Sequence, residues 1–166
     1  MSAFVLMGVS GAGKTTVGQR VAAELELTFL EGDQFHPQDN IAKMSSGVPL
    51  TDEDRKPWID ALAKAVNERR PKRDAVIACS ALSRLVRERL RDAAQEPLHF
   101  LLLTADRSVI AKRLKVRPRH FMKAGMLESQ LAALETPSDA VTVDGDRPLP
   151  EVCAEVANHI RRLRAR

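Results

Sequence analysis

The chain has 166 residues, of which 44% are hydrophobic and 29% are charged, a composition typical of one soluble globular domain. It excludes a disordered or collagen-like chain, and no stretch reaches the ~20 apolar residues that a membrane helix requires. The net charge of +4 comes from 26 basic and 22 acidic residues. Four arginines at the end of a helical pattern account for this excess, so we expect neither a nucleic acid nor a membrane as a partner.

The two cysteines, Cys79 and Cys153, are far apart in the sequence and form no C-x-x-C motif. We expect both to be buried small hydrophobic residues rather than a disulfide or a metal site. The first basic residue is Lys14, so the amino terminus lacks the basic opening of a secretory signal. A cytoplasmic location is expected.

Short apolar, β-branched runs alternate with longer amphipathic runs along the chain. This alternation predicts a single α/β domain over residues 1–166, a three-layer sandwich around a parallel, mostly five-stranded sheet, with ligands bound at the carboxyl ends of the strands. The strands are predicted at 3–7, 28–30, 75–78, 99–103 and 141–143, and the helices at 14–26, 58–69, 83–94, 108–115, 127–134 and 151–163.

The first predicted strand is followed by G-V-S-G-A-G-K-T at residues 8–15, which matches the phosphate-loop pattern G-x-x-x-x-G-K-[ST]. Glycines let successive backbone N–H groups and a helix amino terminus point at phosphates. Lys14 is expected to bind the β- and γ-phosphates of ATP, and the Thr15 hydroxyl to coordinate Mg²⁺. The nucleotide site is expected to include Gly8, Val9, Ser10, Gly11, Ala12, Gly13, Lys14, Thr15 and Thr16.

A phosphate loop occurs in GTPases, ATPase motors and kinases. The chain has no N-K-x-D run for guanine recognition, and its length leaves little room for motor domains, so a small kinase is favoured. The predicted third strand carries no acidic residue as a second metal anchor. We therefore expect Mg²⁺ to be held by Thr15, phosphate oxygens and water, with Asp33 next to the water ligands.

The segment after the second strand, from Glu31 to Pro57, is rich in turn residues and is longer than a simple loop between two elements. A short helix is possible near residues 40–44. Thr51 and Asp54 have the spacing of a capping box, but Pro57 indicates a kink or a delayed helix start, so the helix is predicted from Trp58. Trp58 is expected to pack in the core rather than against a sugar.

This segment also holds the candidate acceptor residues. Asp33 could accept a hydroxyl proton, or it could form an Asx-turn or a helix cap. His36 could donate to a substrate oxygen or brace the turn, and the two readings are even. Arg55 has the planar fork that suits a carboxylate, but residues 52–56 could also be an ordinary solvated helix start with local ion pairs.

Seven basic residues and no acidic one lie between Arg107 and Lys123. We predict a mobile lid at about 113–126, because cations that close over the nucleotide neutralise the transferring group and exclude water. About half of the seven are expected to be solvated helix-face charges. Arg113 and Arg117 lie one helical turn apart and are expected to point into the cleft.

Residues 32–58 fit G-D-x-x-H-P-x-x-N-x-x-K-M-x-x-G-x-P-L-x-D-x-D-R-x-P-W, residues 79–82 read C-S-A-L, and residues 117–121 fit R-x-x-H-F. Together with the phosphate loop, these motifs resemble the small phosphate-loop gluconokinases, relatives of the shikimate and nucleoside-monophosphate kinases. The resemblance spans almost the whole chain. It implies a nucleoside-monophosphate-kinase-like fold, with an acceptor-binding insertion at about 33–58, and a homodimer.

The resemblance further implies that ATP phosphorylates the 6-hydroxyl of D-gluconate, giving 6-phosphogluconate and ADP. It assigns catalysis to Lys14, Asp33 and Arg117, and the phosphates to Arg113 and Arg117. The residues expected to bind gluconate are Asp33, His36, Arg55 and Ser80.

Some residues differ from the family pattern: Ser83-Arg84 replaces Lys-Lys, Val86 replaces Tyr, and Pro118-Arg119 stands where Gly usually precedes His. These differences concern how the lid hinges and whether residue 83 contacts the acceptor. Two alternatives stay open at this point. One is a kinase of another small hydroxylated acid, such as shikimate, or of a nucleoside monophosphate, and the other is a nucleotide-binding module without enzymatic activity that uses the arginine-rich tail.

Overall fold

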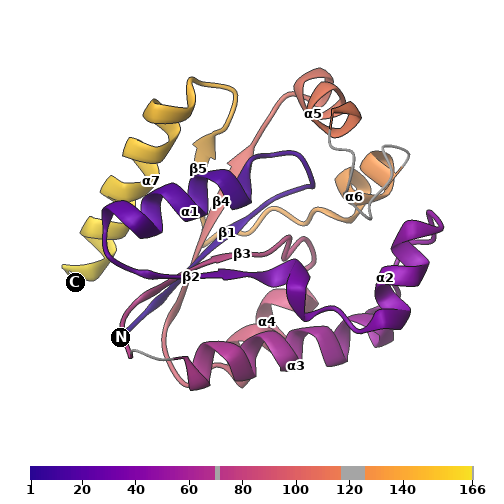
Figure 1. Cartoon of the computed structure of the whole chain (residues 1–166), viewed down its shortest axis with the longest axis horizontal. Coiled ribbons are helices and arrows are strands. Elements are labelled where there is room, and N and C mark those ends of the chain that lie inside the picture. The colour runs from indigo at the N-terminus through magenta and orange to yellow at the C-terminus, as the bar shows by residue number, and fades with distance from the viewer. Residues whose placement is uncertain (70–71, 117–125, 166) are drawn as a thin grey trace.

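A computed structural model describes residues 1–69, 72–116 and 126–165 of the chain. Its five strands form one parallel sheet in the order β2-β3-β1-β4-β5, which confirms the predicted fold class (Figure 1). All five predicted strands are present, each within one residue of its expected bounds. The strands are β1 (Ala3–Met7), β2 (Thr28–Glu31), β3 (Ala75–Ala78), β4 (Leu98–Thr104) and β5 (Val141–Asp144).

Helices cover both faces of the sheet and so complete the three layers (Figure 1). Side chains alternate along β1, so that Phe4 and Leu6 face one core and Val5 and Met7 face the other. Every residue of β1 is fully buried, as a central parallel strand requires. The first core is closed by α1 (Lys14–Glu24) and α7 (Leu149–Arg164), and the second by α3 (Asp52–Glu68) and α4 (Arg84–Ala93).

The remaining short helices gather at the carboxyl edge of the sheet (Figure 1). The chain first adds β2 and β3 on one side of β1 and then β4 and β5 on the other, so the winding reverses at β1. Ligands of open α/β sheets bind at such a reversal, beyond the carboxyl ends of the strands. The helices at this edge are η1 (Gly32–Phe35), α2 (Gln38–Ser45), α5 (Arg107–Lys115) and α6 (Leu127–Ala133).

The start predicted for the helix at 58–69, which is α3 in the structure, is wrong. Helix α3 begins at Asp52 instead of Trp58 and runs through Pro57. Both halves of the capping box form, since the Asp54 N–H donates to Thr51 Oγ1 at 3.2 Å and the Thr51 N–H donates to Asp54 Oδ2 at 2.9 Å. This cap satisfies amide groups of the first turn and outweighs the backbone hydrogen bond that Pro57 cannot donate. The short helix suspected near residues 40–44 is α2.

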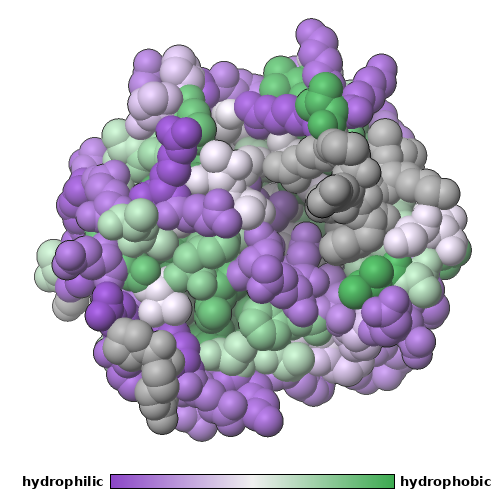
Figure 2. Space-filling model, in the orientation of Figure 1, coloured by the Kyte–Doolittle hydropathy of each residue, from purple (hydrophilic) through white to green (hydrophobic). Residues whose placement is uncertain are grey.

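The arginine-rich end of α7 is held against the body of the domain. Arg161 pairs with Glu24 at 2.6 Å, and Arg164 pairs with Asp74 at 2.9 Å. Hydrophilic residues form most of the face shown in Figure 2, with smaller apolar areas between them. No helix in the described ranges is long and apolar enough to cross a membrane. Both cysteines are buried thiols, as predicted.

Candidate active site

The loop between β1 and α1 has a backbone shape that suits phosphate binding. Gly8 has a φ of 139°, and a Cβ there would lie 2.6 Å from the Leu103 carbonyl oxygen, so no other residue fits. Gly13 adopts a left-handed conformation directly before α1, and no side chain caps this helix end. The amide groups of the loop and of the first turn of α1 therefore form an anion-binding nest.

Lys14 lies across this loop. Its Nζ atom donates to the Gly8 carbonyl at 2.9 Å and to the Val9 carbonyl at 3.0 Å. The ammonium group is thus already inside the nest. A polyphosphate that enters the loop would meet this positive charge together with the backbone amides.

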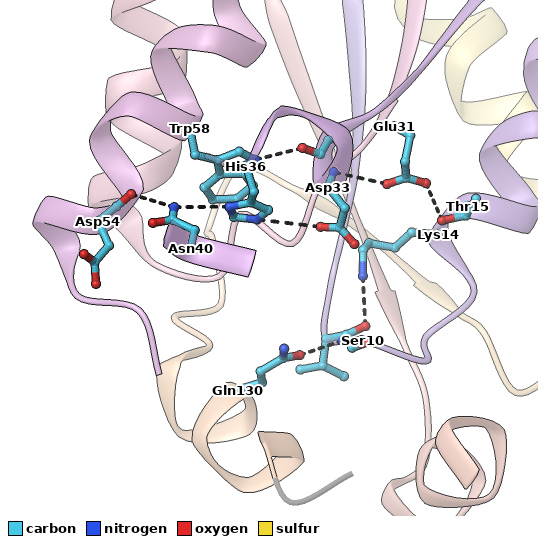
Figure 3. Close-up of polar contacts among 12 residues, drawn as sticks. Ser10, Lys14, Thr15, Glu31, Asp33, His36, Asn40, Asp54, Trp58 and Gln130 are labelled. Atoms are coloured by element: carbon cyan, nitrogen blue, oxygen red, sulfur yellow. Dashed lines mark hydrogen bonds and ion pairs between the residues drawn. The ribbon is translucent and has the colours of Figure 1, made fainter. Parts of the chain in front are cut away.

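Thr15, the predicted metal ligand, is bonded to a carboxylate that the sequence interpretation missed. Its hydroxyl donates to Glu31 Oε2 at 2.6 Å, and Glu31 Oε1 accepts from the Asp33 N–H at 3.4 Å (Figure 3). The pKa of Glu31 is raised above its usual value, because the effect of burial exceeds the opposing effect of the hydrogen bond from Thr15. This set of oxygen atoms next to a phosphate nest has the chemistry that Mg²⁺ prefers.

The carboxylate of Asp33 and the ammonium of Lys14 point into the same space in Figure 3. Asp33 sits on η1, directly after β2, as the parallel sheet predicted. Burial raises the pKa of the Cys79 thiol to about 12, and the charges of Asp33, Lys14 and Glu31 all act on this thiol. The three groups therefore converge at the carboxyl ends of β1, β2 and β3.

His36 both braces its segment and presents a donor. Its ring stacks on Trp58 with ring centroids 4.2 Å apart, and its Nδ1 atom lies 3.3 Å from the Asn40 side-chain nitrogen. Because that nitrogen can only donate, Nδ1 is the acceptor and Nε2 carries the proton. Nε2 lies 3.9 Å from Asp33 Oδ1. Burial, aided by the charge of Arg55 and opposed by that of Asp33, lowers the pKa of His36 to about 4, so the ring is neutral at physiological pH.

A network of side chains holds His36 in place. Asn40 is buried and also donates to the Asp54 carbonyl at 2.8 Å. Lys43 donates to both carboxylate oxygens of Asp54 at 2.8 Å and lowers the pKa of that carboxyl to about 2. Trp58 is buried, as predicted, and its indole N–H donates to the Gly32 carbonyl at 2.8 Å. Helices α2 and α3 are thereby fixed against the end of β2.

A cavity of about 430 Å³ lies beside this network. Arg55 from α3, His36 from the segment after η1 and Ser80 from the end of β3 all line it, so the structure brings three of the four predicted acceptor residues together. Asp33 is not in the described lining but lies next to His36. Ser83 also lines the cavity, and Arg55 is partly neutralised by Asp52 at 3.3 Å. This mixed polar and apolar lining suits a small hydroxylated anion.

A second cavity of about 290 Å³ lies on the other side of the phosphate loop. Arg113 lines it and donates to the carbonyls of Gly11 at 3.2 Å and Gly145 at 3.1 Å, so in this structure its guanidinium braces the loop and the turn after β5. Its predicted contact with phosphate stays a prediction. The described lining also includes Thr16, Val17, Val116, Arg147 and Leu149.

Arg117, the R-x-x-H-F motif and most of the predicted lid lie outside the described residues. The structure also identifies residues at the site that the sequence interpretation missed: Glu31, Gln130 and Arg147. Asn40 was matched to the family motif but was given no role. Glu31 had a usable signal, since it is a carboxylate two positions before Asp33 at the end of a strand. Gln130 had none, because it lies within an ordinary amphipathic helix.

The sequence is similar to those of known proteins along most of its length. A family model described as an AAA domain matches residues 4–137. The thermoresistant gluconokinase of Escherichia coli K12 is 44% identical over 96% of this chain and 93% of its own length. The gluconokinase of Gluconobacter oxydans 621H is 42% identical over 95% of this chain and 90% of its own length.

Solved structures are also similar to this chain. The crystal structure of a gluconokinase from Sinorhizobium meliloti 1021 superimposes with a TM-score of 0.85 at 41% identity, covering 98% of this chain and 93% of that one. A putative kinase from Chloroflexus aurantiacus, at 17% identity and a TM-score of 0.60, shares the fold.

Proposed function

The chain belongs to the gluconokinase family, and from this membership and the site geometry we infer that it transfers the γ-phosphoryl group of ATP to the 6-hydroxyl of D-gluconate, giving 6-phosphogluconate and ADP. One observation carries this conclusion. The Asp33 carboxylate points into the same space as Lys14 of the phosphate nest in Figure 3, and it lies 3.9 Å from Nε2 of His36, which lines the polar cavity. A phosphoryl donor and an alcohol acceptor can therefore meet at Asp33.

The reaction needs mainly alignment and charge neutralisation. We assign to Asp33 the task of orienting the acceptor hydroxyl and accepting its proton as the new O–P bond forms. From its place beside the Gly8 and Val9 carbonyls, Lys14 would bind the β- and γ-phosphates, where it offsets the charge that builds up in the transition state. The bond between the γ-phosphorus and the bridging oxygen then breaks, and ADP leaves.

Mg²⁺ fits the oxygen-rich corner that Thr15 and Glu31 form. We propose that the Thr15 hydroxyl is its protein ligand beside the nucleotide phosphates and that Glu31 accepts hydrogen bonds from water around it. When bound, the ion would neutralise phosphate charge. No cluster of three acidic, histidine or cysteine side chains that could hold a metal occurs in the described residues.

For the sugar acid, Arg55 is the proposed partner of the carboxylate, since it is the described lining residue with a planar cationic fork. The neutral His36 would donate from Nε2 to a sugar hydroxyl near Asp33. Ser80 can donate or accept. The backbone carbonyl of Ser80 accepts a hydrogen bond from the Gly8 N–H at 3.1 Å, so Ser80 contacts both the acceptor cavity and the phosphate loop.

The second cavity is the proposed adenine site, because it adjoins the loop and has an apolar lining of Val17, Val116 and Leu149 between Arg113 and Arg147. We also propose the segment at about 113–126 as a lid that brings Arg117, and with it Arg113, to the phosphates. A homodimer and a cytoplasmic location are further proposals, which light scattering and cell fractionation would test.

Purified protein with Mg²⁺ and ATP, offered a panel of acceptors, tests the assignment. We expect ADP release with D-gluconate and a product identical to 6-phosphogluconate by mass and NMR. Shikimate and nucleoside monophosphates should give at most background ADP release. The motif at residues 32–58 resembles that of the gluconokinases and argues against either compound as the acceptor. A clear preference for another acid would contradict the acceptor assignment and leave the fold intact.

A second candidate, a nucleotide-binding module that uses the arginine-rich tail, is not favoured. Arg161 and Arg164 are engaged with Glu24 and Asp74, so they form part of the folded domain.

A further inference from the structure

Gln130 lies where the phosphate loop and the acceptor cavity meet. This residue is on α6, and only 7% of it is exposed. Its Oε1 atom accepts a hydrogen bond from the Ser10 N–H at 2.7 Å, across 120 positions of sequence (Figure 3). The same side chain lines the acceptor cavity. A buried polar side chain that serves both places is poorly explained by packing alone.

The bond acts on one particular peptide unit. The Val9 carbonyl and the Ser10 N–H belong to the same planar group. The Val9 oxygen accepts from Lys14 Nζ at 3.0 Å, and the Ser10 N–H donates to Gln130. Gln130 and Lys14 therefore hold the two ends of one peptide plane, and rotation of that plane would disturb both contacts.

The other end of the connection reaches the acceptor cavity. Met126, Ser129, Gln130 and Ala133 of α6 and its start form part of the cavity wall. After α6, the Glu135 N–H donates to the Leu82 carbonyl at 2.9 Å, which ties this segment to the opposite wall. A sugar acid that fills the cavity thus contacts the element that carries Gln130.

We propose that Gln130 is a positioning residue that orients the Val9–Ser10 peptide, and through it Lys14, according to whether the acceptor cavity is filled. The proposal rests on the proposed function of the two sites. Occupancy of the cavity would be transmitted to the phosphate loop through a single side-chain hydrogen bond, so that Lys14 reaches its working position once the alcohol is in place.

Substitutions at Gln130 test the hydrogen bond in steady-state kinetics. Gln130→Met keeps the length of the side chain but removes the acceptor. We expect kcat to fall about tenfold while KM for ATP changes less than about threefold, since a buried N–H loses its partner but the other nest amides remain. Gln130→Glu keeps an acceptor oxygen but places a negative charge beside the phosphate nest, so it should preserve the hydrogen bond from the Ser10 N–H without restoring kcat. Glu128→Gln, on the exposed side of α6, is the matched control and should change kcat less than about twofold.

The Ser10 amide of the native protein gives a readout that does not depend on activity or on the folding of a variant. In ¹H–¹⁵N spectra without nucleotide, addition of gluconate should shift the Ser10 resonance and change its hydrogen exchange, and the response should be absent in Gln130→Met. A Ser10 amide that does not respond to saturating gluconate in the native protein overturns the proposal, as does a Ser10 response in Gln130→Met equal to that of the native protein. Failure to bind gluconate at all would instead contradict the proposed function.

Discussion

The phosphate side and the acceptor side of this site are built by different means. On the phosphate side, main-chain N–H groups between Gly8 and Thr15 form most of the anion-binding surface, and one lysine adds a positive charge. On the acceptor side, the main chain only supports a network of side chains, in which Asn40 holds His36 and Lys43 holds Asp54. Under the proposed function, phosphate recognition would be fixed by backbone shape, whereas acceptor recognition would depend on a set of individual side chains.

This difference has a consequence for substitutions. A change on the phosphate side should affect every nucleotide-dependent step, whatever the acceptor. A change on the acceptor side should alter the affinity for the sugar acid while nucleotide binding persists. The predictions below test this separation, from the largest expected effect to the smallest.

Lys14→Met should lower kcat by about 10³-fold or more, because the variant keeps the stem but loses the only side-chain cation described within the loop. Steady-state assays with ATP and gluconate measure the loss. Calorimetry should show that gluconate still binds. If gluconate binding disappears as well, the two sides are not separate.

Asp33→Asn should lower kcat by about 10²- to 10³-fold, because the amide can still accept a hydrogen bond but cannot take the proton. Binding of ATP, measured by calorimetry, should stay within about threefold of native. Near-normal turnover would show that Asp33 is neither the base nor an essential positioning group.

Arg55→Lys should raise KM for gluconate about 10- to 100-fold with little change in kcat or in KM for ATP, because a point charge replaces a bidentate fork. Asp52→Asn is informative as a companion, since it removes the carboxylate that pairs with Arg55 at 3.3 Å. It should lower KM for gluconate or leave it unchanged. A parallel rise in KM for ATP in Arg55→Lys would contradict the assignment.

The last prediction concerns the free energy of unfolding as a function of pH, and not turnover or substrate affinity. The pKa of His36 is lowered from 6.5 to about 4 in the folded protein, so the unfolded chain binds the extra proton first as the pH falls. The neutral ring therefore favours the folded state above pH 6.5, and this contribution, about 3 kcal/mol, is lost as the pH falls from 6.5 towards 4. Thermal unfolding of native protein and of His36→Gln across this range should show the steeper loss in the native protein.

His159→Gln is the control for that measurement, because burial also lowers the pKa of His159 but this ring lies on α7, away from the site. Glu31, whose pKa is raised, contributes a slope of the opposite sign that is common to all three proteins. Identical pH profiles for native protein and His36→Gln would mean that His36 is charged or exposed in the folded state.

Much of the fold follows from local chemistry. The strands and the phosphate loop were predictable because alternating runs and glycine spacing are short-range signals. The capping box of α3 was visible at Thr51 and Asp54, but Pro57 was given too much weight, since a well-capped first turn tolerates the missing donor. Asp33 was found because topology places the end of β2 beside the loop.

What escaped the sequence is set by contacts between distant segments. The bond between Gln130 and Ser10 joins positions 120 residues apart, and no local pattern encodes it. The tautomer of His36 depends on Asn40, whose own orientation depends on the Asp54 carbonyl at the start of another helix. Arg113 lies against backbone carbonyls because of where α5 packs, which its helical spacing alone does not specify.

The stacked pair of Trp58 and His36 has a practical use. The chain contains one tryptophan and no tyrosine, so its intrinsic fluorescence comes almost entirely from a ring in the wall of the acceptor cavity. The emission intensity and wavelength should therefore report ligand entry without any attached dye. Rapid mixing with sugar acids would then follow occupancy of that cavity in real time, separately from phosphoryl transfer.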